Sequence, residues 1–198
     1  MDWVRVGVVL GFIAPIVGIG GILCAIISYP LFSWTQNALS DLGVVDGMTQ
    51  GVFNGSLCVT GVLVLGFVIF SLYEFVAKTL RGQIGVLVFG VASGALSLIG
   101  IFTENNMTLH YSVALGFFIL APLALFIFTL CFYTTHQYRL ALFTVAMGLI
   151  AILPWILLSL WAYVPNVAIP ELISAIAISA WIMGICIKLY KTPQKKHH

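Results

Sequence analysis

Long apolar stretches alternate along the chain with short polar connections. A membrane-spanning helix needs about 20 mostly apolar residues, whereas a strand of a membrane β-barrel alternates apolar and polar positions over about ten residues. The apolar stretches here are continuous and rich in Leu, Ile, Gly and Phe. The pattern predicts an all-α membrane protein, a six-transmembrane-helix bundle with spans at about 4–28, 50–77, 83–103, 109–133, 140–163 and 169–190.

The composition excludes a water-soluble domain. Of the 198 residues, 62% are hydrophobic and 7% are charged, and the mean hydropathy is +1.15. Soluble domains carry roughly 25% charged residues. This chain has too few charged residues to cover a surface that faces water. The first apolar stretch, Val6 to Ile27, is too long for the core of a signal peptide, and no small-residue cleavage site follows it. We therefore expect a retained first helix and a single polytopic membrane domain over residues 1–198.

The basic residues predict the orientation in the membrane. With six spans, all eight lysines and arginines fall on one side of the membrane, and the connections on the other side contain none. Basic residues favour the cytoplasmic side, so both termini are expected to be cytoplasmic in a multi-pass protein of the cell membrane. Because the basic residues are spread over several segments, they do not indicate nucleic-acid binding. Membrane lipids are the expected partners. They are Arg5, Lys78, Arg81, Arg139, Lys188, Lys191, Lys195 and Lys196.

Small residues and cysteines within the spans are expected to serve packing. Helices approach closely where small residues line one face, as they do at Gly7 and Gly11 in span one. A second such face in span three contains Gly90, Ser93, Gly94 and Ser97. The cysteines have no metal-ligand spacing and are expected to pack as buried apolar groups; they are Cys24, Cys58, Cys131 and Cys186.

The most polar stretch of the chain, "FSWTQNALSDLG" at 32–43, follows the first span. Ser33 and Gln36 have the spacing of a capping box, and Gly43 is a typical helix stop. These signals predict a short interfacial helix over about 34–42, in which Asn37 and Asp41 share a face beside Ser40. The alternative is an ordinary solvated loop.

Three further polar residues are expected at the same membrane depth. Asn54 lies about one turn into span two, Glu104 ends span three, and His110 begins span four. Polar groups inside a membrane are costly and often functional. Together with the stretch at 32–43 they predict a polar pocket on the extracytoplasmic side, formed by spans one to four. The alternative is that His110 only caps or bridges backbone at a helix end.

The same residues resemble a known family. "NALSDLG" (37–43), "FNGSL" (53–57) and "GIF" (100–102), followed by an acidic loop and His110, resemble the domain-of-unknown-function family 998. That family consists of small six-span membrane proteins from archaea and bacteria, so the resemblance implies a prokaryotic source and supports the fold. Thr103 stands where the family commonly has proline. The resemblance implies no activity, and it implies these signature residues: Asn37, Ser40, Asp41, Gly43, Asn54 and His110.

The residue pattern does not favour a metal site or a haem site. A zinc hydrolase commonly needs three protein ligands, and His110 is the one histidine expected on the outer side. Asp41 and Glu104 could complete a site, but their spacing is not that of metal ligands. His110 and His136 are separated by about 39 Å of helix at 1.5 Å per residue, which rules out a shared haem iron. We expect no metal site, and the sequence identifies no cofactor.

The predicted pocket suggests either a chemical step or simple binding. His110 and Asp41 are candidate catalytic residues for acid–base chemistry, since a histidine beside a carboxylate can move a proton. Ser40 with His110 and Asp41 would match a serine hydrolase by residue type, but no nucleophile-elbow motif surrounds Ser40. A lipid or other small amphiphile is the expected ligand. The alternative is a non-enzymatic scaffold, sensor or small-molecule carrier. Asn37, Ser40, Asn54 and Glu104 are the candidate ligand-binding residues.

Overall fold

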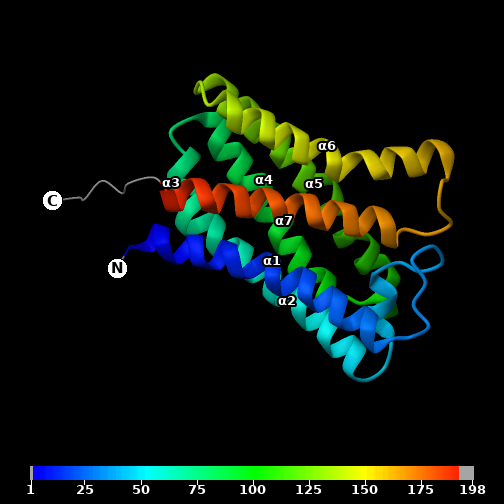
Figure 1. The fold of residues 1–198 in the computed structure, drawn as a ribbon. Coiled ribbons are helices and arrows are strands. Elements are labelled where there is room, and N and C mark those ends of the chain that lie inside the picture. The colour runs from blue at the N-terminus through cyan, green and yellow to red at the C-terminus, as the bar shows by residue number, and fades with distance from the viewer. Residues whose placement is uncertain (1, 192–198) are drawn as a thin grey trace.

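The computed structural model describes residues 2–191, which form helices joined by short connections (Figure 1). Within this range six helical segments are long and apolar enough to cross a membrane, as predicted. The second span is α2, a π-helical turn and α3 in succession. The α-helices are α1 (Trp3–Ser28), α2 (Met48–Phe67), α3 (Tyr73–Val76), α4 (Leu80–Ile101), α5 (Met107–Thr134), α6 (Tyr138–Trp161) and α7 (Ala168–Lys191); the short elements are η1 (Ser40–Val44, 3₁₀), η2 (Val68–Leu72, π) and η3 (Glu104–Asn106, 3₁₀).

The six spans form a closed ring in chain order. Each span packs against the next, from α1 and α2 through α4, α5 and α6 to α7, and α7 packs back against α1. Consecutive spans run in opposite directions, so the described chain begins and ends at one end of the bundle (Figure 1). An even number of antiparallel helices always has this consequence.

The two ends of the bundle differ in charge. The end that holds both chain ends contains the six described lysines and arginines, and we call it the basic end. The opposite end, the acidic end, holds the connections 29–47, 102–106 and 162–167 and the start of α7. Its acidic residues are Asp41, Asp46, Glu104 and Glu171. Lys195 and Lys196 lie outside the described residues.

Glycine permits close contact between α2 and α4. A Cβ on Gly61 would lie against the Ser97 hydroxyl and 2.6 Å from the Ser93 carbonyl oxygen. Ser97 in turn donates a hydrogen bond to the Cys58 carbonyl at 3.0 Å. The predicted packing role is thus correct for the serines of the small-residue face in span three. Gly94, on the same helix, takes no part in the contact, because a Cβ added there would have no neighbouring atom within 4 Å.

The start of α1 packs on the π-helical turn of the second span. A Cβ on Gly7 would clash with the Ser71 hydroxyl, and Ser71 donates a hydrogen bond to the Val4 carbonyl at 2.7 Å. Gly11 is similarly close to Cys186 and Phe67. Both glycines of span one therefore serve helix packing, as their spacing predicts.

The cysteines are free thiols, and one of them departs from the prediction. Cys131 and Cys186 are buried and Cys58 is partly buried, whereas Cys24 is exposed. The prediction of a buried thiol is wrong for Cys24, because this position lies on the outer side of α1. A thiol is apolar enough to face lipid there as readily as it packs in a core.

Candidate functional site

The segment 33–44 folds over the acidic end of the bundle, and side chains hold its backbone. Asn37 Oδ1 accepts from the Ser33 amide at 2.9 Å, and Asp41 Oδ2 accepts from the Ala38 amide at 3.1 Å. The predicted helix over 34–42 is therefore displaced: the short helix is the 3₁₀ turn η1, Ser40–Val44. The capping box does not form, since Asn37 rather than Gln36 binds the Ser33 amide. Amides held by side chains cannot join an α-helical ladder.

Asn37 and Asp41 also contact each other directly. Asn37 Nδ2 donates to Asp41 Oδ2 at 2.6 Å, so this one carboxyl oxygen accepts from both a side chain and the Ala38 backbone. The predicted proximity of Asn37 and Asp41 is present in the structure. Their mutual contacts give them a structural role, which is to fix the turn that precedes η1.

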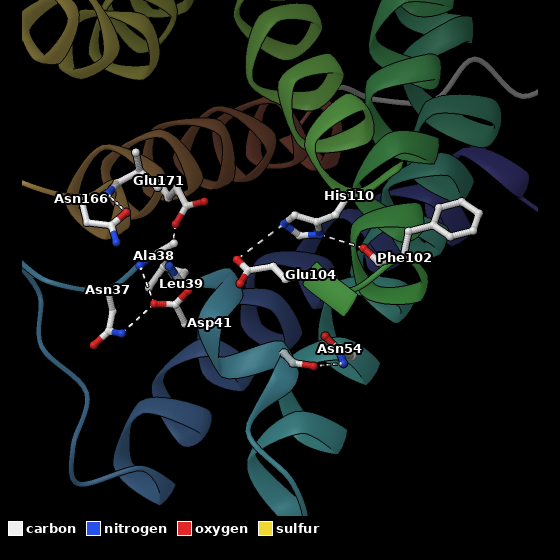
Figure 2. A network of polar contacts seen from close by, with 12 residues as sticks. Asn37, Ala38, Leu39, Asp41, Asn54, Phe102, Glu104, His110, Asn166 and Glu171 are labelled. Carbon is white, nitrogen blue, oxygen red and sulfur yellow. Dashed lines mark hydrogen bonds and ion pairs between the residues drawn. The ribbon is translucent and has the colours of Figure 1, made fainter. Parts of the chain in front are cut away.

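Asn54 fixes η1 on α2. Its Nδ2 donates to the Gly43 carbonyl at 2.9 Å, and its Oδ1 would lie 2.5 Å from a Cβ at position 43. Gly43 is therefore needed for the close approach of η1 to α2, and it lies within η1 instead of ending a helix. Asn54 lies apart from Asn37 and Asp41 in Figure 2. Asn54 thus lies at the same end and contacts η1, but among the described residues no hydrogen bond joins its side chain to those of the other predicted binding residues.

His110 connects the start of α5 with the end of α4 and with η3. Its Nδ1 lies 2.7 Å from the Phe102 carbonyl oxygen, which can only accept, so Nδ1 carries the hydrogen. Nε2 points toward Glu104, whose Oε1 lies 4.0 Å away (Figure 2). His110 therefore bridges backbone at a helix end through one nitrogen, as the alternative predicts, while its other nitrogen faces a carboxyl group.

Glu104 joins His110 to the segment 33–44. Besides its approach to His110, the Glu104 side chain interacts with those of Ser40 and Asp41. Figure 2 shows Glu104 between His110 and Asp41. The carboxyl group nearest His110 is thus that of Glu104, and Asp41 stands behind it.

Glu171, in the first turn of α7, is a site residue that sequence reasoning did not include. Its Oε2 accepts from the Leu39 amide at 2.6 Å, and the residue is only 8% exposed. The carboxyl groups of Glu104 and Asp41 are close enough to repel it. The available signal was an acidic residue at the start of an apolar span, but its partner lies 132 residues away in the chain.

An elongated cavity of about 90 Å³ runs from this polar cluster into the bundle. It lies among α1, α2, α4, α5 and α7, and most of its wall is apolar, for example Ile22, Leu57, Phe117 and Ile178. At its acidic end the wall is formed by Ser40, His110 and Glu171. Of the predicted site residues, Ser40 and His110 therefore line the cavity, while Asn37, Asp41, Asn54 and Glu104 stand behind its wall.

The sequence as a whole matches a family of known proteins. The family described as "Protein of unknown function (DUF998)" matches residues 12–188. The chain belongs to this family. No curated protein and no solved structure matches it. The family description names no activity, so the activity of this DUF998 member has to be inferred from the site itself.

The described residues of this DUF998 member contain no group of three or more His, Cys, Asp or Glu side chains that could hold a metal ion. His110 is 7% exposed and already bound through Nδ1, and Asp41 is bound to Asn37 and Ala38. What the cluster offers is hydrogen-bond acceptors at the end of an apolar cavity.

Proposed function

We propose that this DUF998 protein binds a lipid or other single-chain amphiphile in the cavity, with the polar head at Ser40, His110 and Glu171. The observation that carries the proposal is the cavity itself, which is mostly apolar along its length and has His110 and Glu171 at one end. Ligand pockets are typically apolar with a few polar groups that orient the ligand. The position of the cavity also gives the direction of the bound ligand, because the polar end of the cavity lies at the acidic end of the bundle.

The length of the cavity wall, and not its volume of about 90 Å³, is the dimension that matches a hydrocarbon tail. On α2 its wall extends from Phe53 to Val64, and on α7 from Glu171 to Ile182. Each interval covers about 16 Å at 1.5 Å per residue, roughly half of a bilayer's hydrocarbon core. A tail that follows this wall would thus lie parallel to the lipid tails outside, with its head at the level of the membrane interface.

Orientation of the protein follows from the charges of the two ends. We infer that the basic end faces the cytoplasm and that the acidic end, with the mouth of the cavity, faces outward across a cell membrane. The exposed Asp46 at the acidic end and the exposed Arg139 at the basic end provide matched positions for a test.

The inferred orientation predicts which end can be labelled from outside. In a variant without native cysteines, a membrane-impermeant maleimide should label Asp46→Cys in intact cells. Arg139→Cys should react only after the membrane is permeabilised. The reverse pattern would place the cavity mouth in the cytoplasm.

A second candidate function, acid–base catalysis on the bound molecule, is favoured by the geometry of His110. Because Nδ1 is fixed on the Phe102 carbonyl, Nε2 is the nitrogen that faces Glu104, and His110 itself lines the cavity. A histidine near a carboxyl group can take up and return a proton. In this role Glu104 would hold His110, and Asp41 and Asn37 would hold the segment that carries Ser40.

Blocking the cavity should sharply reduce binding even though every residue of the polar cluster is kept. Ala114 lines the cavity, and Ile119 on the same helix is 50% exposed on the outer surface. Native mass spectrometry of the purified protein should show a bound amphiphile in the wild type and in Ile119→Phe. Occupancy in Ala114→Phe should fall at least about tenfold, because a phenyl ring would fill the space of the tail.

A non-enzymatic scaffold would give a different result with the same variants. If the wild type, Ile119→Phe and Ala114→Phe carry the same molecules in the same amounts, the cavity is not a binding site. A His110→Gln variant that only lowers thermal stability, with no change in bound molecules or in lipid turnover, would then assign the polar cluster to structure.

A further inference from the structure

The head-group end of the cavity offers acceptors and no cationic partner from the chain. Glu171 and His110 line it, and Glu104 lies behind His110. Among residues 2–191 every lysine and arginine lies at the basic end. On α7 the nearest of them, Lys188, lies 17 residues beyond Glu171, about 26 Å along the helix. A ligand head group therefore meets the carboxyl groups without competition from a side-chain cation.

One oxygen of Glu171 is available to a ligand. Oε2 is occupied by the Leu39 amide, and no hydrogen bond to Oε1 is formed within the described residues. No fully buried side-chain oxygen in that part of the chain lacks a partner, so Oε1 keeps some exposed surface, and Glu171 is a residue of the cavity wall. This oxygen belongs to a residue that is only 8% exposed and that lines a mostly apolar cavity.

In its neutral form, His110 offers Nε2 as a second acceptor. At 4.0 Å its distance to Glu104 Oε1 is too long for a hydrogen bond, and Nδ1 is the nitrogen that carries the hydrogen. A donor placed between Nε2 and Glu171 would thus be accepted on two sides. An anionic head group would instead face carboxyl groups with no arginine or lysine to neutralise it, which is costly in a desolvated site.

We propose that the head group recognised by this cavity is a cationic hydrogen-bond donor, an ammonium group on a single alkyl chain. This rests on the proposed function and adds the chemical class of the ligand. The ammonium would donate to Glu171 and to His110, and the chain would occupy the apolar part of the cavity. Ammonium donors suit carboxyl acceptors because charge-assisted hydrogen bonds are stronger than neutral ones.

The test compares three probes with the same twelve-carbon chain and different head groups: dodecylammonium, dodecanoate and dodecyl maltoside. Each is bound below its micellar concentration to the full-length protein in uncharged nanodiscs. Binding to Ala114→Phe is subtracted, because this variant reports uptake by the lipid alone. We expect dodecylammonium to bind at least ten times more tightly than dodecanoate and several times more tightly than dodecyl maltoside.

Two variants separate contact from long-range charge. Glu171→Gln should reduce the preference for dodecylammonium to about threefold or less. Asp46→Asn removes an exposed carboxyl group from the same end and should leave the preference intact. Equal or tighter binding of dodecanoate or dodecyl maltoside in the wild type, or equal loss of preference in both variants, would overturn the ammonium proposal. Binding of none of the three probes above the Ala114→Phe level would overturn the proposed function as well.

Discussion

Replacing Gly61 with valine is expected to lower the free energy of unfolding by about 1–3 kcal/mol, near the upper end of that range. The added Cβ would lie 2.6 Å from the Ser93 carbonyl oxygen and equally close to the Ser97 amide, both in the backbone of α4. Backbone cannot move aside like a side chain, so α2 and α4 would have to separate. Thermal unfolding in detergent, followed by loss of helical circular dichroism, measures the effect.

The matched control for this prediction is Gly94→Val on α4. No atom lies within 4 Å of a Cβ at position 94, so the same substitution should change stability by less than about 0.5 kcal/mol. Because α2 and α4 both contribute walls to the cavity, Gly61→Val should also reduce amphiphile binding. If the two variants were equally stable, the close packing of α2 on α4 would be wrong.

Replacing Glu171 with leucine is expected to release the segment 33–44 from α7. The Leu39 amide is buried and would lose its acceptor, which costs about 1–3 kcal/mol. Two further contacts, from the Ala168 amide to the Asn37 carbonyl and from Asn166 Nδ2 to the Gln36 carbonyl, would remain. Hydrogen exchange at the Leu39 amide should therefore become about ten times faster or more, while exchange in the centre of α4 changes little.

Glu171→Gln distinguishes the hydrogen bond from the charge. The amide oxygen of glutamine can still accept from Leu39, and it removes the repulsion from Glu104 and Asp41. We expect exchange at Leu39 close to that of the wild type and stability within about 1 kcal/mol of it. Fast exchange in both variants would mean that Glu171 holds the segment through its charge and not through this contact.

The fold could be predicted from the sequence because the bilayer constrains it so strongly. A chain with six long apolar stretches has to satisfy its backbone within helices, and the basic residues then fix their alternation. The ends of the predicted spans differ from the helices by only a few residues; the second span, for instance, is 50–77 in the prediction and Met48–Val76 in the structure. The π-helical turn at Val68–Leu72 has no sequence signal comparable to an apolar stretch.

The short helix after span one was predicted in the wrong place because side chains compete for its backbone. Ser33 and Gln36 match the capping pattern, yet Asn37 and Asp41 are just as able to accept from nearby amides, and in the structure they do. The third competitor, Glu171, comes from α7. A local sequence pattern cannot include a partner so distant in the chain. The position of the short helix therefore depends on the tertiary fold.

For the site, sequence predicted which residues gather at one end but not which of them face the cavity. His110 and Ser40 line it, whereas Asn37 and Asn54 are occupied by backbone and side-chain contacts within the acidic end. Membrane depth follows from position along a span, and the sequence therefore reports it well. The direction of a side chain around the helix axis depends on how six helices close into a ring, which the sequence pattern does not specify.

The most direct measurement of the central claim is to map where a photoactivatable alkyl amphiphile reacts with the protein. With a diazirine in the alkyl chain, adducts identified by peptide mass spectrometry should fall on buried residues of the cavity, Leu57, Phe117 and Ile178, and should disappear in Ala114→Phe. Adducts confined to lipid-facing neighbours such as Val59, Leu115 and Ile176, with the same yield in Ala114→Phe, would show that the chain stays in the bilayer and would contradict an amphiphile-binding cavity.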